Sequence, residues 1–205
     1  MRNVKGLVAA AATSAAVLGL LAAPSASAAD APKDHGKPVT SLSGLKLVPS
    51  KAQGARVAGR SAAQLDGPYL IESVEGERCL DADTGTLWEN GTTVALWDCD
   101  EYAANQGWYV DQAADGTITL ENAASGRVLD ADLDTIGENG TKVQLWDRNG
   151  WNNQKWKFYL SESDDLIIEN QESFQVLDAD GNSIYEPGTP VQLWDYTGGG
   201  NQLWR

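Results

Sequence analysis

Residues 175–204 of the 205-residue chain read QVLDADGNSIYEPGTPVQLWDYTGGGNQLW. The same pattern occurs twice before, as RVLDADLDTIGENGTKVQLWDRNGWNNQKW at 127–156 and as RCLDADTGTLWENGTTVALWDCDEYAANQGW at 78–108. The first Asp residues of the copies, Asp81, Asp130 and Asp178, lie 49 and 48 positions apart, and 16 positions separate each from the Trp of Leu-Trp-Asp. Because such regularity is typical of structural repeats, we expect the three copies to share one local fold.

The repeats predict an all-β domain. Their apolar runs are short, Asn-Gly or Pro-Gly turns separate them, and no helical period is sustained. A propeller needs about four to eight blades, whereas three copies close naturally around a pseudo-threefold axis. We therefore predict a β-trefoil over 66–205, with repeats at about 66–110, 111–160 and 161–205.

The region before the repeats has two parts. Residues 1–29 carry Arg2 and Lys5, then an Ala/Leu-rich stretch and a small-residue Ala-x-Ala site, which predicts a secretory signal peptide and a secreted protein with no membrane span after cleavage. Residues 30–65 lack periodicity, contain several Pro and Gly, and have six basic against two acidic residues, a net charge of +4. This composition predicts a flexible basic leader or pro-segment.

Charge and rare residues exclude several functions. The chain has a formal charge of −14, but 66–205 holds seven basic and 27 acidic residues, a charge of −20. Nucleic acid needs clustered Lys and Arg and is therefore not an expected partner. The single His, His35, falls in the leader, which leaves the repeats without an obvious general base. We expect no enzyme activity, no metal and no cofactor.

Strand alternation suggests a binding role for the repeated Trp. In Val143-Gln144-Leu145-Trp146, the two aliphatic side chains share one face, and the Gln and Trp share the other. With the aliphatic pair inward, the Trp lies outward, and this placement occurs in all three copies. A sugar ring needs a flat aromatic side chain for its apolar face and carboxylate or amide groups for its hydroxyls. The repeats supply both.

The Cys79-Leu80-Asp81 element, the Val-Gln-Leu-Trp runs and the three Gln-x-Trp elements resemble the ricin B-chain type lectin repeat, also called carbohydrate-binding module family 13. The resemblance covers about 66–205 and all three copies. It implies a lectin that binds sugar through an Asp, a strand Gln, a strand Trp and an Asn in each copy. The implied ligand-binding residues are Asp81, Trp97 and Asn105, then Asp130, Gln144, Trp146 and Asn153, and finally Asp178, Gln192, Trp194 and Asn201.

The first copy departs from this pattern because Ala95 replaces the strand Gln and the segment before Asn105 is one residue longer. We expect its site to be weaker than the others. The resemblance also implies a disulfide between Cys79 and Cys99, and structural roles in the core for the Gln-x-Trp residues. These are Gln106, Trp108, Gln154, Trp156, Gln202 and Trp204.

Each copy also has an acid two residues after the pocket aspartate: Asp83, Asp132 and Asp180. In an extended segment such pairs face the same way and repel unless they are solvated or bind a cation. Calcium is an alternative, but the second copy has Thr where an EF-hand loop requires Gly and Glu. We therefore expect solvated loop carboxylates.

Three readings remain open. The favoured one is a monomeric, secreted lectin module for a neutral oligo- or polysaccharide of the galactose, arabinose or xylose type. A protein-binding trefoil such as a protease inhibitor would need one distinctive loop, for which 100–104 and 184–187 are the candidates. A glycosidase would use paired carboxylates, but a catalytic pair should be unique, whereas these acids recur in all three copies.

Overall fold

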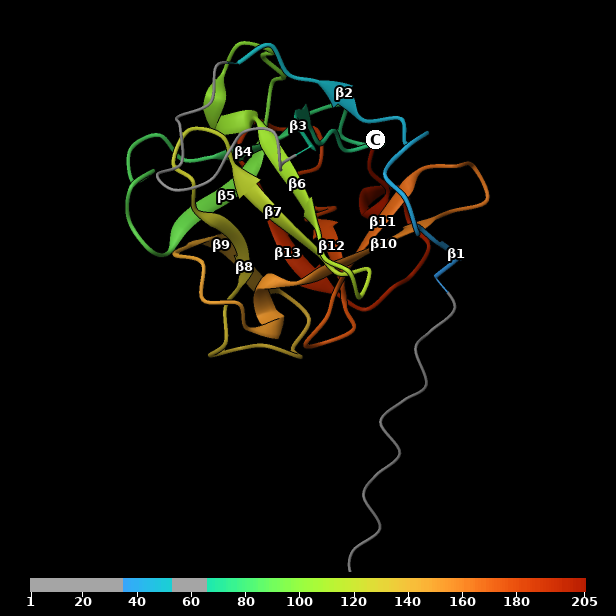
Figure 1. Ribbon diagram of the computed structural model, residues 1–205. Helices are drawn as coiled ribbons and strands as arrows, with labels where there is room; N and C mark the ends of the chain where they lie inside the picture. The colour runs from blue at the N-terminus through green and yellow to red at the C-terminus, as the bar shows by residue number, and fades with distance from the viewer. Residues whose placement is uncertain (1–34, 53–65) are drawn as a thin grey trace, which may run out of the picture. The chain divides into compact units, whose positions relative to one another are not determined.

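The computed structural model describes residues 35–52 and 66–205 (Figure 1), so the predicted signal peptide lies outside the described residues. These residues form thirteen β-strands and three short 3-10 helices, and no described helix is long and apolar enough to cross a membrane. The strands are β1 (Lys37–Pro38), β2 (Val48–Pro49), β3 (Asp66–Leu70), β4 (Cys79–Ala82), β5 (Thr92–Trp97), β6 (Trp108–Gln112), β7 (Ile118–Asn122), β8 (Val128–Ala131), β9 (Thr141–Trp146), β10 (Trp156–Leu160), β11 (Leu166–Asn170), β12 (Val176–Ala179) and β13 (Thr189–Trp194). The 3-10 helices are η2 (Ala104–Gln106), η3 (Asn152–Gln154) and η4 (Gly200–Gln202).

Six segments form a closed barrel. β3 pairs with β6, β6 with β7, β7 with β10, and β10 with β11, all antiparallel. The sixth segment is the C-terminal one, where Trp204 bridges both Leu166 and Ser73 and so joins the last repeat to the first. Closure leaves the barrel without the free edges of an open sheet.

Three hairpins complete the fold. They are β4–β5, β8–β9 and β12–β13, one from each copy. Their second strands also pair with one another in a ring, β5 with β9, β9 with β13 and β13 with β5. A barrel joined to a ring of three equivalent hairpins is a β-trefoil, which confirms the predicted fold.

The three Gln-x-Trp tryptophans lie in the core. Trp108, Trp156 and Trp204 are fully buried, and each indole Nε1 donates a hydrogen bond to a backbone carbonyl. The accepting residue directly precedes the pocket aspartate of the same copy, so the core Trp also fixes the strand that carries this aspartate. The acceptors are Leu80, Leu129 and Leu177, at 3.0, 3.2 and 3.1 Å.

Residues 35–52 do not form the flexible leader expected from composition. β1 adds to β10 and β2 adds to β3, so two short strands extend the barrel hairpins. Apolar side chains between them, including Leu45 and Leu47, pack against the core cluster. Two-residue strands carry too little alternation to be recognised in a sequence, and the partner of β1 lies more than 100 residues further along the chain.

His35 is the clearest correction to the sequence-based expectations. The side chain is 2% exposed, and its Nε2 lies 2.9 Å from Oε2 of Glu169 in β11. Its ring also packs edge-on against Tyr196, with 4.8 Å between ring centroids. The only His therefore belongs to the folded part of the chain, and the expectation that the leader holds it apart is wrong.

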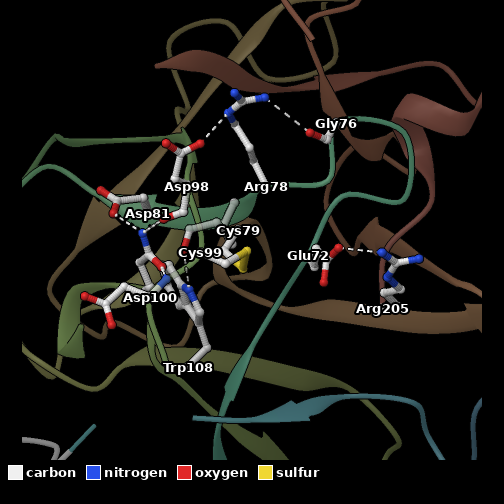
Figure 2. Close-up of a disulfide and its surroundings, with 12 residues drawn as sticks. Glu72, Gly76, Arg78, Cys79, Asp81, Asp98, Cys99, Asp100, Trp108 and Arg205 are labelled. Atoms are coloured by element: carbon white, nitrogen blue, oxygen red, sulfur yellow. Dashed lines mark hydrogen bonds and ion pairs between the residues drawn. A yellow bond between two sulfur atoms is a disulfide. The ribbon is translucent and has the colours of Figure 1, made fainter. Parts of the chain in front are cut away.

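Cys79 and Cys99 form the predicted disulfide, with their Cα atoms 5.0 Å apart. Figure 2 shows the bridge beside Asp81 and the buried Trp108. The two copies without cysteines have other contacts at the position that corresponds to Cys99. Arg148 binds Glu121 at 2.9 Å in the second copy, and Tyr196 packs against His35 in the third.

Candidate functional site

The hairpin register brings each pocket aspartate to its strand glutamine. Asp130 in β8 lies opposite Gln144 in β9, and Asp178 in β12 lies opposite Gln192 in β13. Directly opposed residues of an antiparallel pair share one face, so their side chains meet. Each Gln Nε2 donates to Oδ1 of its aspartate at 3.1 Å.

A second set of amides arrives from the 3-10 helix that follows each hairpin. Asn153 Nδ2 and Gln154 Nε2 both donate to Oδ2 of Asp130, at 2.8 and 2.9 Å. The carboxylate is thus held by three amide groups and is 3% exposed. The third copy repeats this arrangement with Asn201, Gln202 and Asp178, at 2.8 and 2.9 Å.

The glutamine of Gln-x-Trp has a second role that the sequence does not reveal. Gln154 Nε2 also donates to the carbonyl of Asp147 at 3.0 Å, and its Oε1 accepts from the backbone N–H of Asn149 at 2.9 Å. It therefore ties the end of the Leu-Trp-Asp strand to Asp130. Gln106 and Gln202 make equivalent contacts, so these residues position the pocket aspartates as well as filling the core.

The first copy keeps the aspartate and the 3-10 helix contacts. Oδ2 of Asp81 accepts from Asn105 at 2.9 Å and from Gln106 at 2.8 Å. The residue opposite Asp81 is Ala95, which has no amide to offer to Oδ1. A hollow of about 970 Å³ opens here, against about 380 Å³ at the third site. The missing side chain therefore widens the first site, and its weaker binding stays a prediction.

The strand tryptophans lie on the surface beside these aspartates. Trp97 is 49% exposed, and Trp146 and Trp194 are each 37% exposed. The Val and Leu of each Val-x-Leu-Trp strand are buried, as the alternation predicts. One broad face of an aromatic ring is thus available in each copy next to hydrogen-bonding groups.

A turn glycine from a neighbouring copy lies beside the edge of each of these rings. A Cβ added to Gly188 would lie 3.4 Å from the Trp97 ring, and one added to Gly91 would lie 3.9 Å from the Trp146 ring. Both glycines have positive φ, +88° and +90°, which side-chain-bearing residues rarely adopt. Neighbouring repeats therefore build each site together.

Asp130 and Asp178 are buried and Asp81 is half-buried, but all three remain hydrogen-bond acceptors. Burial raises the pKa of Asp81, Asp130 and Asp178 above the ordinary aspartate value, and the amide donors oppose this rise. A neutral amide donor stabilises the ionised form without adding charge. The arrangement presents a desolvated carboxylate that suits donors such as hydroxyl groups.

The second acidic side chain of each copy accepts a hydrogen bond from the backbone of the turn that follows it. Asp83 Oδ1 accepts from the N–H of Gly85 at 2.9 Å, Asp132 Oδ1 from the N–H two residues on at 3.1 Å, and Asp180 Oδ1 from that of Asn182 at 3.0 Å. These contacts are the side-chain-to-backbone bonds typical of Asp in turns. Within 35–52 and 66–205, no three His, Cys, Asp or Glu side chains group as metal ligands.

Two models of known protein families together match the whole repeat region. A model described as ricin-type β-trefoil lectin domain-like matches residues 56–146, and one described as ricin-type β-trefoil lectin domain matches 116–205. The repeat region is a ricin-type β-trefoil lectin domain. This confirms the resemblance seen in the repeats and supports carbohydrate binding, without catalysis, as the activity of the lectin domain.

Solved structures share the fold of the lectin domain, whereas a search of curated proteins finds no match. ThreeFoil, a designed threefold-symmetric protein, is 26% identical with a TM-score of 0.63, covering 68% of this chain and 97% of its own. An exo-β-1,3-galactanase from Clostridium thermocellum is 28% identical with a TM-score of 0.62, and the match covers 67% of this chain but 29% of the galactanase. The ricin B-like lectin of Macrolepiota procera, solved with lactose, is 23% identical with a TM-score of 0.55 over 65% of this chain and 89% of its own.

Proposed function

We propose that the lectin domain binds neutral glycans through up to three sites, one per repeat, each built from an exposed Trp beside an Asp held by amides. The observation that carries this proposal is that an exposed Trp beside an Asp held by the amides of a 3-10 helix occurs three times. The contacts of Asp130 and Asp178 agree to within 0.1 Å between copies. The Gln-x-Trp tryptophans fill the core, whereas the strand tryptophans lie partly exposed on the surface.

The chemistry of each site suits a pyranose. The Trp ring stacks against the apolar C–H face of the sugar, and the aspartate accepts hydrogen bonds from neighbouring hydroxyls. The strand Gln and the Asn complete the rim in the second and third sites. Site residues in this proposal are those that the family resemblance assigns.

The charge of the domain supports a neutral ligand. Residues 66–205 carry a net charge of −20, which repels uronates and sulfated or phosphorylated sugars. Galactose-, arabinose- or xylose-type glycans fit this condition. Three weak sites on one rigid body raise the avidity for a polymer by about 10²-fold or more when its geometry allows simultaneous contact.

Export is part of the proposal. The signal-peptide pattern of 1–29 and the Cys79–Cys99 bridge both suit an extracellular protein, because disulfides persist in oxidising compartments. We further propose that the domain acts as a monomer, which light scattering coupled to size-exclusion chromatography would test.

Binding to a glycan array and to insoluble polysaccharides tests the function. The combined Trp146→Ala and Trp194→Ala variant should lose most binding while its unfolding midpoint stays close to that of the parent, because both side chains are partly exposed. Trp88→Ala is the matched control, since Trp88 is 63% exposed and lies outside the three constellations. Undiminished binding by the double variant would show that the site assignment is wrong.

A further inference from the structure

Trp151 is an exposed aromatic side chain that the three constellations do not use. It is 60% exposed and directly precedes η3. Ala103 and Gly199 occupy the same position before η2 and η4, with similarly extended backbones. Because the turn forms equally well on Ala and Gly, the fold does not require an indole at this position.

A hollow of about 430 Å³ lies against Trp151. This volume falls within the range of small-molecule sites, about 300–1,000 Å³. The hollow has an apolar side, provided by Trp151 and Leu133, and a polar side of amides and one carboxylate. Its lining residues are Leu133, Gly150, Trp151, Asn152, Asn153 and Glu172.

Asn153 connects this hollow to the second constellation. Its Nδ2 donates to Asp130 at 2.8 Å and to the carbonyl of Ala131 at 2.9 Å. Its Oδ1 is buried and has no hydrogen-bond partner among the described residues. A buried acceptor without a donor costs about 1–3 kcal/mol, and such groups normally find a water or ligand partner. A hydroxyl entering from the hollow would supply this donor.

The other copies do not offer the same surface. Asn105 and Asn201 are only partly buried, whereas Asn153 is 2% exposed. The position of Leu133 is taken by Thr84 in the first copy and by Gly181 in the third. The apolar pair of Trp151 and Leu133 is therefore particular to the second repeat.

We propose that Trp151 and Leu133 form a subsite for a second sugar ring, so that the second site binds two consecutive residues of a neutral oligosaccharide. One ring lies on Trp146 beside Asp130. The next ring stacks on Trp151, and its hydroxyls bind Asn153 and the polar side of the hollow. This inference rests on the proposed function of the second site and adds chain-length specificity to it.

The test isolates the second site. Trp97→Ala and Trp194→Ala together remove the other two stacking rings, and calorimetry then measures binding of galactose, lactose, xylose and xylotriose. In this background we expect lactose to bind about 10-fold more tightly than galactose, or xylotriose about 10-fold more tightly than xylose. A 10-fold ratio equals about 1.4 kcal/mol. Trp151→Ala should abolish this ratio and leave monosaccharide affinity unchanged.

Two further variants sharpen the test. Trp151→Ala and Leu133→Thr each introduce the residue of the first copy, so both should fold, which the unfolding midpoint verifies. Leu133→Thr should reduce the ratio partially. Trp88→Ala removes an equally exposed indole away from the hollow and should leave the ratio intact.

Three results would overturn the subsite. The first is an unchanged ratio in Trp151→Ala. The second is an equal loss of monosaccharide and oligosaccharide affinity, which would place Trp151 in the first ring's site. The third is that the background binds none of the four sugars before Trp151 is changed, in which case the proposed function of the second site fails together with the subsite.

Discussion

Replacing Gln202 by Ala should lower the free energy of unfolding more than replacing the strand glutamine Gln192, although both side chains bind the same aspartate. Gln202 is fully buried, and its Nε2 donates to Asp178 Oδ2 at 2.9 Å and to the carbonyl of Asp195 at 3.0 Å. Its Oε1 accepts from the N–H of Thr197 at 2.8 Å and from the hydroxyl of the same residue at 3.1 Å. The substitution removes all four bonds at once and leaves Asp178, which is 3% exposed, with one donor fewer.

The expected cost follows from these contacts. A hydrogen bond to a charged group contributes about 1.5–3 kcal/mol, and each neutral one contributes about 0.5–1.5 kcal/mol. The sum for one charged and three neutral bonds is on the order of 5 kcal/mol. At about 2–4 °C per kcal/mol for a chain of this size, the melting temperature should fall by roughly 15 °C.

The cost should also depend on pH. Burial raises the pKa of Asp178, and the bond from Gln202 lowers it. Gln202→Ala therefore raises this pKa further above the unfolded value. A carboxyl with a raised folded pKa destabilises the fold above that pKa, and the penalty vanishes as the pH falls through it. The difference in unfolding free energy between variant and parent should thus be largest at neutral pH and narrow in acid.

Urea unfolding at several pH values measures this difference. Gln192→Ala is the matched control, because it removes a single 3.1 Å bond to the other oxygen of Asp178 from a half-buried side chain. We expect it to cost about 1–3 kcal/mol, less than Gln202→Ala. The reasoning fails if Gln202→Ala costs no more than Gln192→Ala, or if its cost is the same at every pH.

Three further predictions concern other parts of the domain. Replacing Cys79 and Cys99 by Ala should lower the unfolding free energy by about 3 kcal/mol, because the bridge closes a loop of roughly 20 residues in the unfolded chain; no change in urea midpoint would contradict this. Ala95→Gln should supply the missing amide to Asp81 and increase the calorimetric stoichiometry for galactose, provided that the parent's first site is weaker than the others. Burial beside Glu169 raises the pKa of Tyr159 to about 12, so stability should be lost as the pH rises from about 10 to 12; Tyr159→Phe should remove this loss, and ultraviolet titration should detect the late-ionising phenol.

Much of the candidate site follows from the repeats alone. The spacing of the copies predicts the trefoil, and the strand alternation predicts which tryptophan faces outward. The structure bears out both features, since Trp146 is partly exposed and Trp156 is fully buried. Sequence reasoning succeeded here because these features depend on local periodicity, which the threefold repetition makes visible.

Other parts of the site could not be predicted in this way. The hollow beside Trp151 depends on Leu133, 18 positions earlier, and on Glu172, which belongs to the next repeat. The role of Gln154 as the holder of Asp130 depends on a 3-10 helix folding back onto a hairpin. No spacing in the chain reveals such contacts, because they are set by how the repeats pack.

The sequence by itself therefore determined the architecture, because three copies of one pattern specify the same local structure, and the family resemblance implied the disulfide and the site residues. Only the tertiary structure decided how the copies differ. Ala95 lines the large first hollow, Trp151 lines a hollow beside Asn153 in the second repeat, and His35 packs on the third repeat. The physical reason is that these differences arise between segments far apart in the chain, where packing and hydrogen bonding, and not periodicity, fix the geometry.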